Sequence, residues 1–176
     1  MIESTARNPI VAEEMTTAFH ASTSRLNPNA PVPNSSQFFT SMRHDDPRRA
    51  AEELLESVRP TNCPRRSDAV YLFEDLQFAT RWAAQRTRTL YRASIKAGSP
   101  IFRGDWNWLP IITNEIVSNP ASAKSNAGKY WSSNATATPV WELLTSSATV
   151  LDEVVITFEE RTRFRLQAAG LPIPST

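Results

Sequence analysis

Residues 70–84 read VYLFEDLQFATRWAA, and this stretch decides the fold class. The apolar run that ends at Phe73 predicts a strand over residues 68–73. Glu74-Asp75 supplies an N-cap for a helix, because carboxylates accept hydrogen bonds from the free N–H groups of a first helical turn. The helical spacing of Leu76, Ala79, Trp82 and Ala83 predicts its buried stripe.

Outward from this unit, further elements are expected along the chain. Asp46-Pro47 and Asn119-Pro120 are typical helix starts, and Asp105 is a third candidate N-cap. Strands and helices interleave irregularly, which favours an α+β domain over a doubly wound parallel sheet. The other expected strands are 16–22, 89–95, 100–103, 141–145 and 150–158. We expect one domain over residues 16–165, preceded by an extended lead-in (1–15) and followed by a tail (166–176). Residues 27–41 and 131–139 are expected to be loops.

Composition sets the class of protein. The 176 residues are 40% hydrophobic and 21% charged, which is ordinary for one globular domain. The net charge of +1 argues against an overall basic field for nucleic acid or membrane, although arginine (16) far exceeds lysine (3). The single Cys63 excludes an internal disulfide. With no apolar run of membrane length and no signal pattern, we expect a cytoplasmic protein, or one delivered into a target cell by another route.

Three separated segments carry candidate functional groups: Phe19-His20-Ala21-Ser22, residues 70–72 and residues 141–144. A strand tyrosine such as Tyr71 can stack on a flat cationic ring. A carboxylate such as Glu142 can stabilise positive charge that develops on a sugar. Each has a plain alternative: His20 bonded to a neighbouring carbonyl, Tyr71 in the core, and Glu142 as a solvated edge residue. Together the segments predict one nicotinamide-dinucleotide cleft.

A family resemblance rests on the same segments. Residues 70–73 followed by 79–83 resemble the strand and helix of the rifampin ADP-ribosyltransferases, and residues 19–22 are similar to their aromatic-His-Gly-Thr opening. Glu142-Leu143-Leu144 and residues 150–156 resemble the glutamate-bearing and terminal strands of DarT-like enzymes and poly(ADP-ribose) polymerases. Across residues 16–158 the chain therefore resembles the His-Tyr-Glu, diphtheria-toxin-like group of ADP-ribosyltransferases.

The resemblance implies a fold and an activity. It implies an ADP-ribosyltransferase-like fold with split central sheets of about six strands, flanked by helices. It implies NAD as substrate and mono-ADP-ribosyl transfer to a host protein or nucleic acid, by a toxin, effector or phage-encoded modifier. A cognate antitoxin or immunity protein would then be a partner. The alternatives are an inactive module that binds ADP-ribose, NAD or a partner protein, and an NAD glycohydrolase.

The resemblance also implies residue roles. His20, Tyr71 and Glu142 would be catalytic, while Ala21 and Ser22 would contact the dinucleotide through backbone and hydroxyl. Glu153 is the rival to Glu142. With only four glycines, the pyrophosphate would need arginine side chains, for which the candidates are Arg25, Arg43, Arg65 and Arg66.

Two further expectations concern the acceptor and metals. Val140 stands two residues before Glu142, where arginine-specific transferases carry a second acidic or amide residue, so an arginine acceptor is disfavoured. Trp131 and the loop 131–139 would shape the acceptor site instead. His20 and His44 lack partners at metal-ligand spacing, so no metal site is expected.

Overall fold

The computed structural model describes residues 10–11 and 15–173 of the chain. It shows an α+β protein whose strands form one antiparallel sheet in the order β1-β5-β6-β3-β2-β4-β7. The strands are β1 (Ile10–Val11), β2 (Thr16–Ser22), β3 (Val70–Phe73), β4 (Thr89–Ile95), β5 (Pro100–Asp105), β6 (Trp141–Thr145) and β7 (Thr149–Val154). The helices are α1 (Ser36–Ser41), α2 (Pro47–Ser57), α3 (Leu76–Gln85), α4 (Trp108–Ser118), α5 (Pro120–Trp131) and α6 (Phe158–Ala168).

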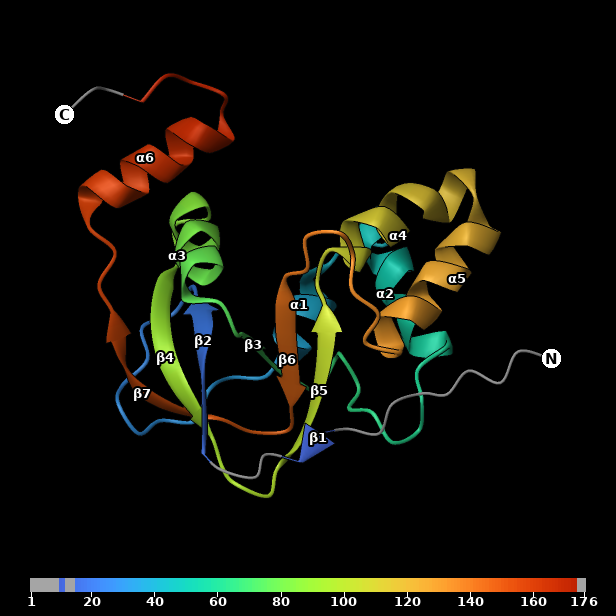
Figure 1. Ribbon diagram of the computed structural model, residues 1–176, viewed down its shortest axis with the longest axis horizontal. Coiled ribbons are helices and arrows are strands. Elements are labelled where there is room, and N and C mark those ends of the chain that lie inside the picture. Colours follow the sequence, from blue (N-terminus) through green and yellow to red (C-terminus); the bar gives the residue numbers. More distant parts are fainter. Residues whose placement is uncertain (1–9, 12–14, 174–176) are drawn as a thin grey trace.

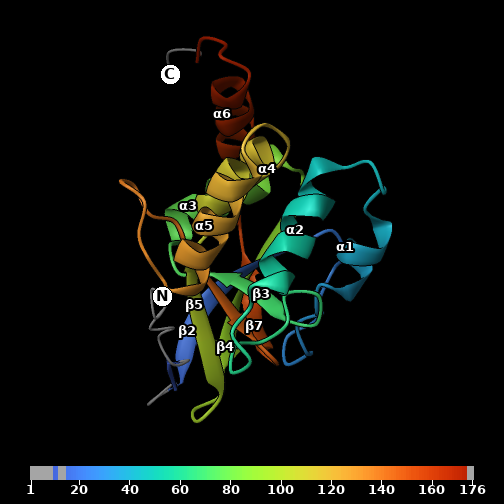
Figure 2. The same cartoon turned by 90° about the vertical axis from the view of Figure 1, so that its right-hand side faces the viewer.

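Two separate groups of helices cover one face of the sheet (Figure 1). Helices α2, α4 and α5 contact one another and share a core with Phe102 of β5 and Leu144 of β6. Helix α3 contacts α6 and shares a second core with Leu90 of β4. Turned by 90°, the molecule shows α2, α4 and α5 on one side of the strands and α6 standing at the far end (Figure 2). The helical layer is therefore divided over the middle of the sheet.

The opposite sheet face buries a third core against a loop. Ala18, Leu72 and Tyr91 belong to this core, and Leu26 and Val32 of the loop after β2 cover it. The backbone N–H of Leu26 donates to the Tyr91 hydroxyl at 2.9 Å, which fixes the loop over the sheet. The loop thus takes the place of a second helical layer.

Capping residues explain where several helices begin. Asp46 accepts from the backbone N–H of Arg48, and Asn119 accepts from that of Ser122, each immediately before a proline. Asp75 caps α3 in the same way. These starts confirm the expected positions of α2, α3 and α5.

The structure corrects several expected boundaries. Residues 36–41, expected to be loop, form a helix. Ile10–Val11, within the expected lead-in, pairs with β5. Strand β5 continues to Asp105, so that α4 begins at Trp108. Within the expected last strand and tail, residues 158–168 form α6, because Thr157 and Glu160 make a capping box that ends the extended chain. Leu76, expected in the buried stripe of α3, is 45% exposed. The rest of the lead-in, residues 1–9 and 12–14, lies outside the described residues.

Candidate functional site: an indole cleft beside a buried charge cluster

Tyr71 and Glu142 share one face of the sheet, and His20 lies on the other. Glu142 pairs in register with Phe73, two residues from Tyr71 on the same strand. Phe73 also pairs with Phe19, so the neighbouring His20 points to the opposite face, where it pairs with Tyr91. The three expected segments do lie on adjacent strands, β2, β3 and β6. Their side chains do not all converge on one pocket.

Residues 19–22, the first expected segment, form hydrogen bonds with nearby parts of the chain. His20 Nδ1 lies 3.0 Å from the backbone oxygen of Tyr71. Burial lowers the pKa of this imidazole, so it is neutral at physiological pH. Ser22 Oγ accepts from the backbone N–H of Ser24, and the Ala21 carbonyl accepts from Arg88 Nη1 at 3.4 Å. The geometry of His20 is that of its plain alternative, a histidine bonded to an adjacent carbonyl.

Glu142 belongs to a buried charge cluster, defined here as Glu52, Arg66, Tyr130 and Glu142. Glu142 Oε1 accepts from Arg66 Nη1 and from the Tyr130 hydroxyl, both at 2.8 Å. The other side of the guanidinium donates to Glu52, from Nε at 2.7 Å and from Nη2 at 3.2 Å. The Tyr71 ring stacks under it, 4.9 Å from Arg66 Cζ. Four segments distant in sequence thus meet at one arginine.

The charge cluster is shielded from water and contains more acidic than basic groups. Two carboxylates face one guanidinium, and the side chains of Arg66 and Glu142 are 3% and 1% exposed. Burial raises the pKa of Glu142, against the opposing attraction of Arg66. Burial also raises the pKa of Tyr130, so its hydroxyl stays protonated and donates.

Other expected site residues lie elsewhere. Glu142 is buried, and the rival Glu153 is exposed on the edge strand β7. Arg25 is exposed in the loop after β2, and Arg65 pairs with Glu56 at 3.0 Å. Trp131, expected near the acceptor, is buried, with its indole N–H donating to a backbone carbonyl of α2.

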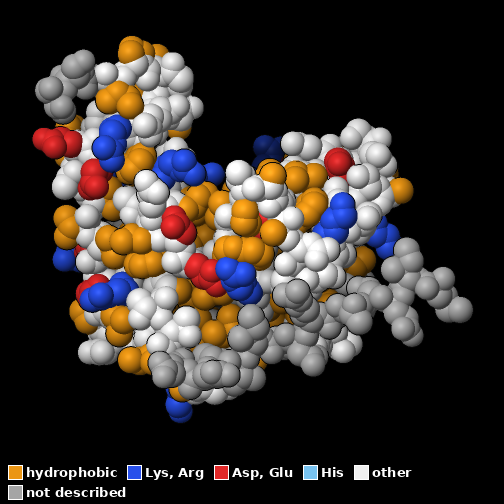
Figure 3. Space-filling view, in the orientation of Figure 1, with side chains coloured by type: hydrophobic (Ala, Val, Ile, Leu, Met, Phe, Trp, Pro, Cys, Tyr) orange, Lys and Arg blue, Asp and Glu red, His pale blue; other side chains and the backbone are white. Residues whose placement is uncertain are grey.

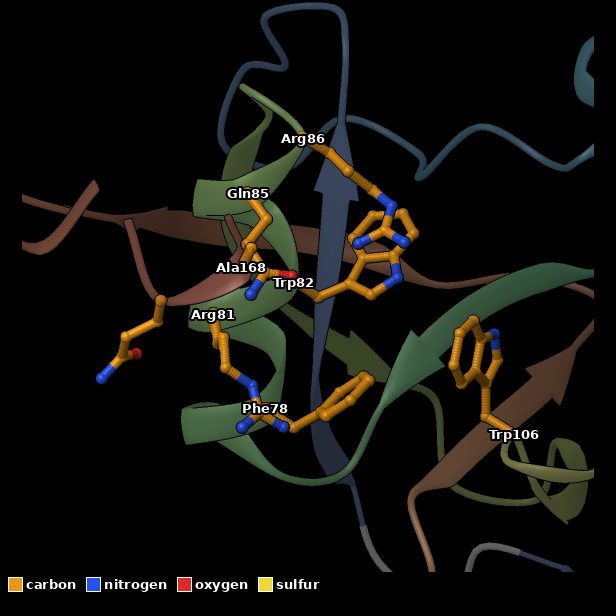
Figure 4. A pocket seen from close by; sticks show the side chains of 8 residues that line it. Phe78, Arg81, Trp82, Gln85, Arg86, Trp106 and Ala168 are labelled. Atoms are coloured by element: carbon orange, nitrogen blue, oxygen red, sulfur yellow. The ribbon is translucent and has the colours of Figure 1, made fainter. Parts of the chain in front are cut away.

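A cleft of about 490 Å³ runs along the exposed face of α3 (Figure 4). Phe78 and Trp82 project from α3 toward Trp106, which follows β5. Phe78 contacts Trp106 with ring centroids 6.0 Å apart, and Trp82 carries the Arg86 guanidinium 4.5 Å from its ring centroid. The other lining residues are Arg81, Gln85, Gln167 and Ala168.

The arginines around this cleft differ from most others in the chain. Arg81, Arg86 and Arg88 form no ion pair with any carboxylate in the described ranges, although they stack on Phe78 or Trp82. The pKa of Arg86 is lowered, mainly by burial and then by the neighbouring positive charges. Arg side chains are visible over α3 and α6 in the space-filling view, together with acidic side chains over α6 (Figure 3). The unpaired arginines make this cleft suited to an anion.

The cleft and the charge cluster are connected through strands β3 and β6 of the sheet. Phe73, the register partner of Glu142, lies 5.6 Å from the Trp82 ring and 5.0 Å from Phe78. On the other side, Trp106 donates its backbone N–H to Val140 at 2.7 Å, two residues before Glu142. The surface is hollowed between the α3–α6 lobe and the helices α4 and α5 (Figure 3). Phe73, which pairs with Glu142, therefore packs beneath the aromatic lining of the cleft.

Asp105 fixes the wall that carries Trp106. Its buried carboxylate accepts from the backbone N–H groups of Asn107 (3.0 Å), Thr136 (2.7 Å) and Val140 (2.9 Å), and from the Thr136 hydroxyl (2.6 Å). The segment from Thr136 to Val140, which overlaps the expected acceptor loop 131–139, is therefore tied to the end of β5. A preorganised wall of this kind costs a ligand little ordering entropy.

Comparisons with known proteins leave the family open. No protein-family model matches the chain, and no curated protein matches it. No helix in the described part of the chain is long and apolar enough to cross a membrane. Nor do His, Cys, Asp and Glu side chains gather there in a group that could hold a metal ion.

The sequence did not predict which residues would form the charge cluster or the cleft beside α3. Glu52 and Tyr130 lie on helices that were expected, but nothing in their spacing signals a shared buried arginine. Arg66 was a candidate phosphate ligand and is instead the centre of the charge cluster. Trp106 was expected inside a helix, and its position beside α3 follows from the longer β5.

Proposed function

We propose that the protein binds NAD, or the ADP-ribose part of NAD, in the cleft between α3 and Trp106. The observation that carries the proposal is the pairing of unneutralised arginines with indole rings in that cleft. Indole faces stack on flat heterocyclic rings, and guanidinium groups bind phosphate oxygens through charge-assisted hydrogen bonds. A dinucleotide offers both kinds of group in one molecule.

A second feature of the cleft supports a ligand there. Trp82 Nε1 is a buried donor that lacks a hydrogen-bond partner among the described residues. Unsatisfied buried donors are rare in folded proteins, and each calls for an explanation. A phosphate or amide oxygen of a ligand would satisfy this indole N–H.

Calorimetry with NAD, ADP-ribose and AMP tests the proposal. Trp82→Phe and the double variant Arg81→Gln/Arg86→Gln should each weaken NAD binding roughly ten-fold, and higher ionic strength should weaken it further. Trp141→Phe is the matched control, because that indole stacks on Arg103 outside the cleft. Equal affinity in all these variants, or no binding by the wild type, would refute a site in this cleft.

ADP-ribosyl transfer is the second candidate function, and the position of Glu142 favours it. Its Oε1 is held by Arg66 and by the Tyr130 hydroxyl, and its register partner Phe73 packs on Trp82 of the cleft. In this reaction the bond from ribose C1′ to the nicotinamide nitrogen breaks, and its electron pair leaves with nicotinamide. An acceptor nucleophile then bonds to C1′ and gives up a proton. An ADP-ribosyltransferase-like fold is part of this second proposal.

Release of nicotinamide from labelled NAD tests the second function. Because a carboxylate acts mainly in the transition state, Glu142→Gln should abolish turnover and leave NAD affinity within a few-fold. Glu153→Gln, on the exposed edge strand, should keep full turnover. If the wild type binds NAD but releases no nicotinamide, the protein is a binding module and not a transferase. Free ADP-ribose as the sole product would identify a glycohydrolase.

A further inference from the structure

The charge cluster holds more negative than positive charge, and Glu52 is the reason. Arg66 alone would neutralise Glu142, because a single guanidinium would face a single carboxylate. Glu52 takes Nε and Nη2 of Arg66, which leaves Nη1 for Glu142 and Tyr130. Two carboxylates therefore share one cation in a place where water does not screen them.

The surplus charge lies next to the aromatic lining of the cleft. Phe73 separates Glu142 from Trp82, and it contacts both by register and by ring packing. The unpaired arginines lie on α3 and just beyond its C-terminal end. The cleft thus has an electropositive side along α3, and Phe73 stands between its aromatic lining and the buried charge cluster.

We propose that Glu52 is a positioning residue for the ligand site: it holds Arg66 and adds a second carboxylate to the charge cluster, whose net negative charge favours a cationic ring over a neutral one. This inference rests on the proposed dinucleotide site. It adds a role for a residue on α2 that touches no ligand. The effect acts through the field of the cluster, so it does not require Glu142 to be exposed.

Comparing NAD with ADP-ribose isolates the effect, because ADP-ribose lacks the cationic nicotinamide ring. In Glu52→Gln, which is isosteric, NAD affinity should fall roughly five-fold while ADP-ribose affinity stays unchanged. Glu52→Asp keeps the charge and should restore most of the NAD preference. Glu53→Gln is the matched control on the same helix, since the Glu53 side chain is 68% exposed and should leave both affinities unchanged. An unchanged NAD preference in folded Glu52→Gln would overturn the inference.

A titration of ligand-free protein separates this inference from the proposed function. Four groups face the Glu142 carboxyl: Arg66, Glu52, Tyr130 and Tyr71. Removing the negative charge of Glu52 should lower the pKa of Glu142, read by carbon-13 NMR of labelled glutamate. If wild type binds neither nucleotide, the dinucleotide site fails while the titration still tests the charge. A Glu142 pKa that does not fall in Glu52→Gln would overturn the charge-setting role.

The pH dependence of ligand binding by the wild-type protein tests the same inference without a variant. Protonation of Glu142 removes the surplus negative charge, so the ratio of NAD affinity to ADP-ribose affinity should fall as the pH drops through that titration. Both ligands carry the same adenosine and phosphates, whose titrations cancel in the ratio. A ratio that is flat across this pH range would overturn the inference even if Glu52→Gln does not fold.

Discussion

Arg66 Nη1 lies 2.8 Å from Glu142 Oε1, in a pair whose side chains are 3% and 1% exposed. The pair joins the loop before β3 to the start of β6, and Glu52 and Tyr130 join α2 and α5 to it. A charge pair removed from water in this way is tolerated only while every partner stays in place. The cluster is therefore a structural centre of the α2–α4–α5 half, whatever its role toward a ligand.

Removing Arg66 should be severely destabilising. Arg66→Met leaves two buried carboxylates without a cation, and we expect a loss of roughly 3–5 kcal/mol in the free energy of unfolding. Urea unfolding followed by circular dichroism measures it. The neighbouring Arg65→Met should change stability little, because that side chain is 61% exposed. A loss in Arg66→Met no larger than in Arg65→Met would contradict the cluster.

Stability should depend on pH through Glu142. Its pKa is raised in the folded protein, chiefly by burial, so folding favours the protonated form. The resulting stabilisation is complete below the unfolded-state value, roughly pH 4, and is lost as pH rises through the folded-state pKa. The wild type should therefore lose stability relative to Glu142→Gln as pH rises above about 4. Chemical unfolding at several pH values checks this, and the opposite slope would show that Arg66 outweighs burial.

Gly104 should resist even the smallest side chain. A Cβ at this position would lie 2.6 Å from Tyr130 Cε2, a ring held between Arg66 and Phe102. We expect Gly104→Ala to cost about 1–3 kcal/mol by overpacking. Gly128→Ala is the matched control in α5, where a Cβ meets nothing within 4 Å, and it should stabilise by about 0.5–1 kcal/mol. Thermal unfolding of both variants gives the comparison, and equal effects would be inconsistent with the tight contact.

Asp105 should control the wall of the cleft. Asp105→Asn places an amide NH₂ against donors that now meet a carboxylate oxygen, so we expect a loss of about 3 kcal/mol in stability. The resonance of a fluorine-labelled Trp106 should shift and broaden as the wall loosens. Asp45→Asn, whose side chain is 71% exposed, should leave that resonance unchanged. A sharp, unshifted Trp106 signal in Asp105→Asn would argue against the clamp.

Local patterns predicted the elements that carry their own signals. Strands 16–22, 89–95 and 141–145 lie where the sequence places them, because their apolar and polar residues follow the pleat. Asp46-Pro47 and Asn119-Pro120 begin helices as expected. The boundaries at 36–41 and 158–168 were not predicted, because short helices with weak amphipathic patterns depend on capping and packing rather than on periodicity.

The sequence by itself determined an α+β domain with its strands, its capped helices and the placing of His20, Tyr71 and Glu142 on separate strand segments. Only the tertiary structure decided that these strands are neighbours, that His20 faces away from the other two, and that Glu142 is bonded to Arg66. The physical reason is that the periodicity of a strand fixes which residues share a face, whereas strand order and the partners of a buried charge depend on contacts between segments dozens of residues apart.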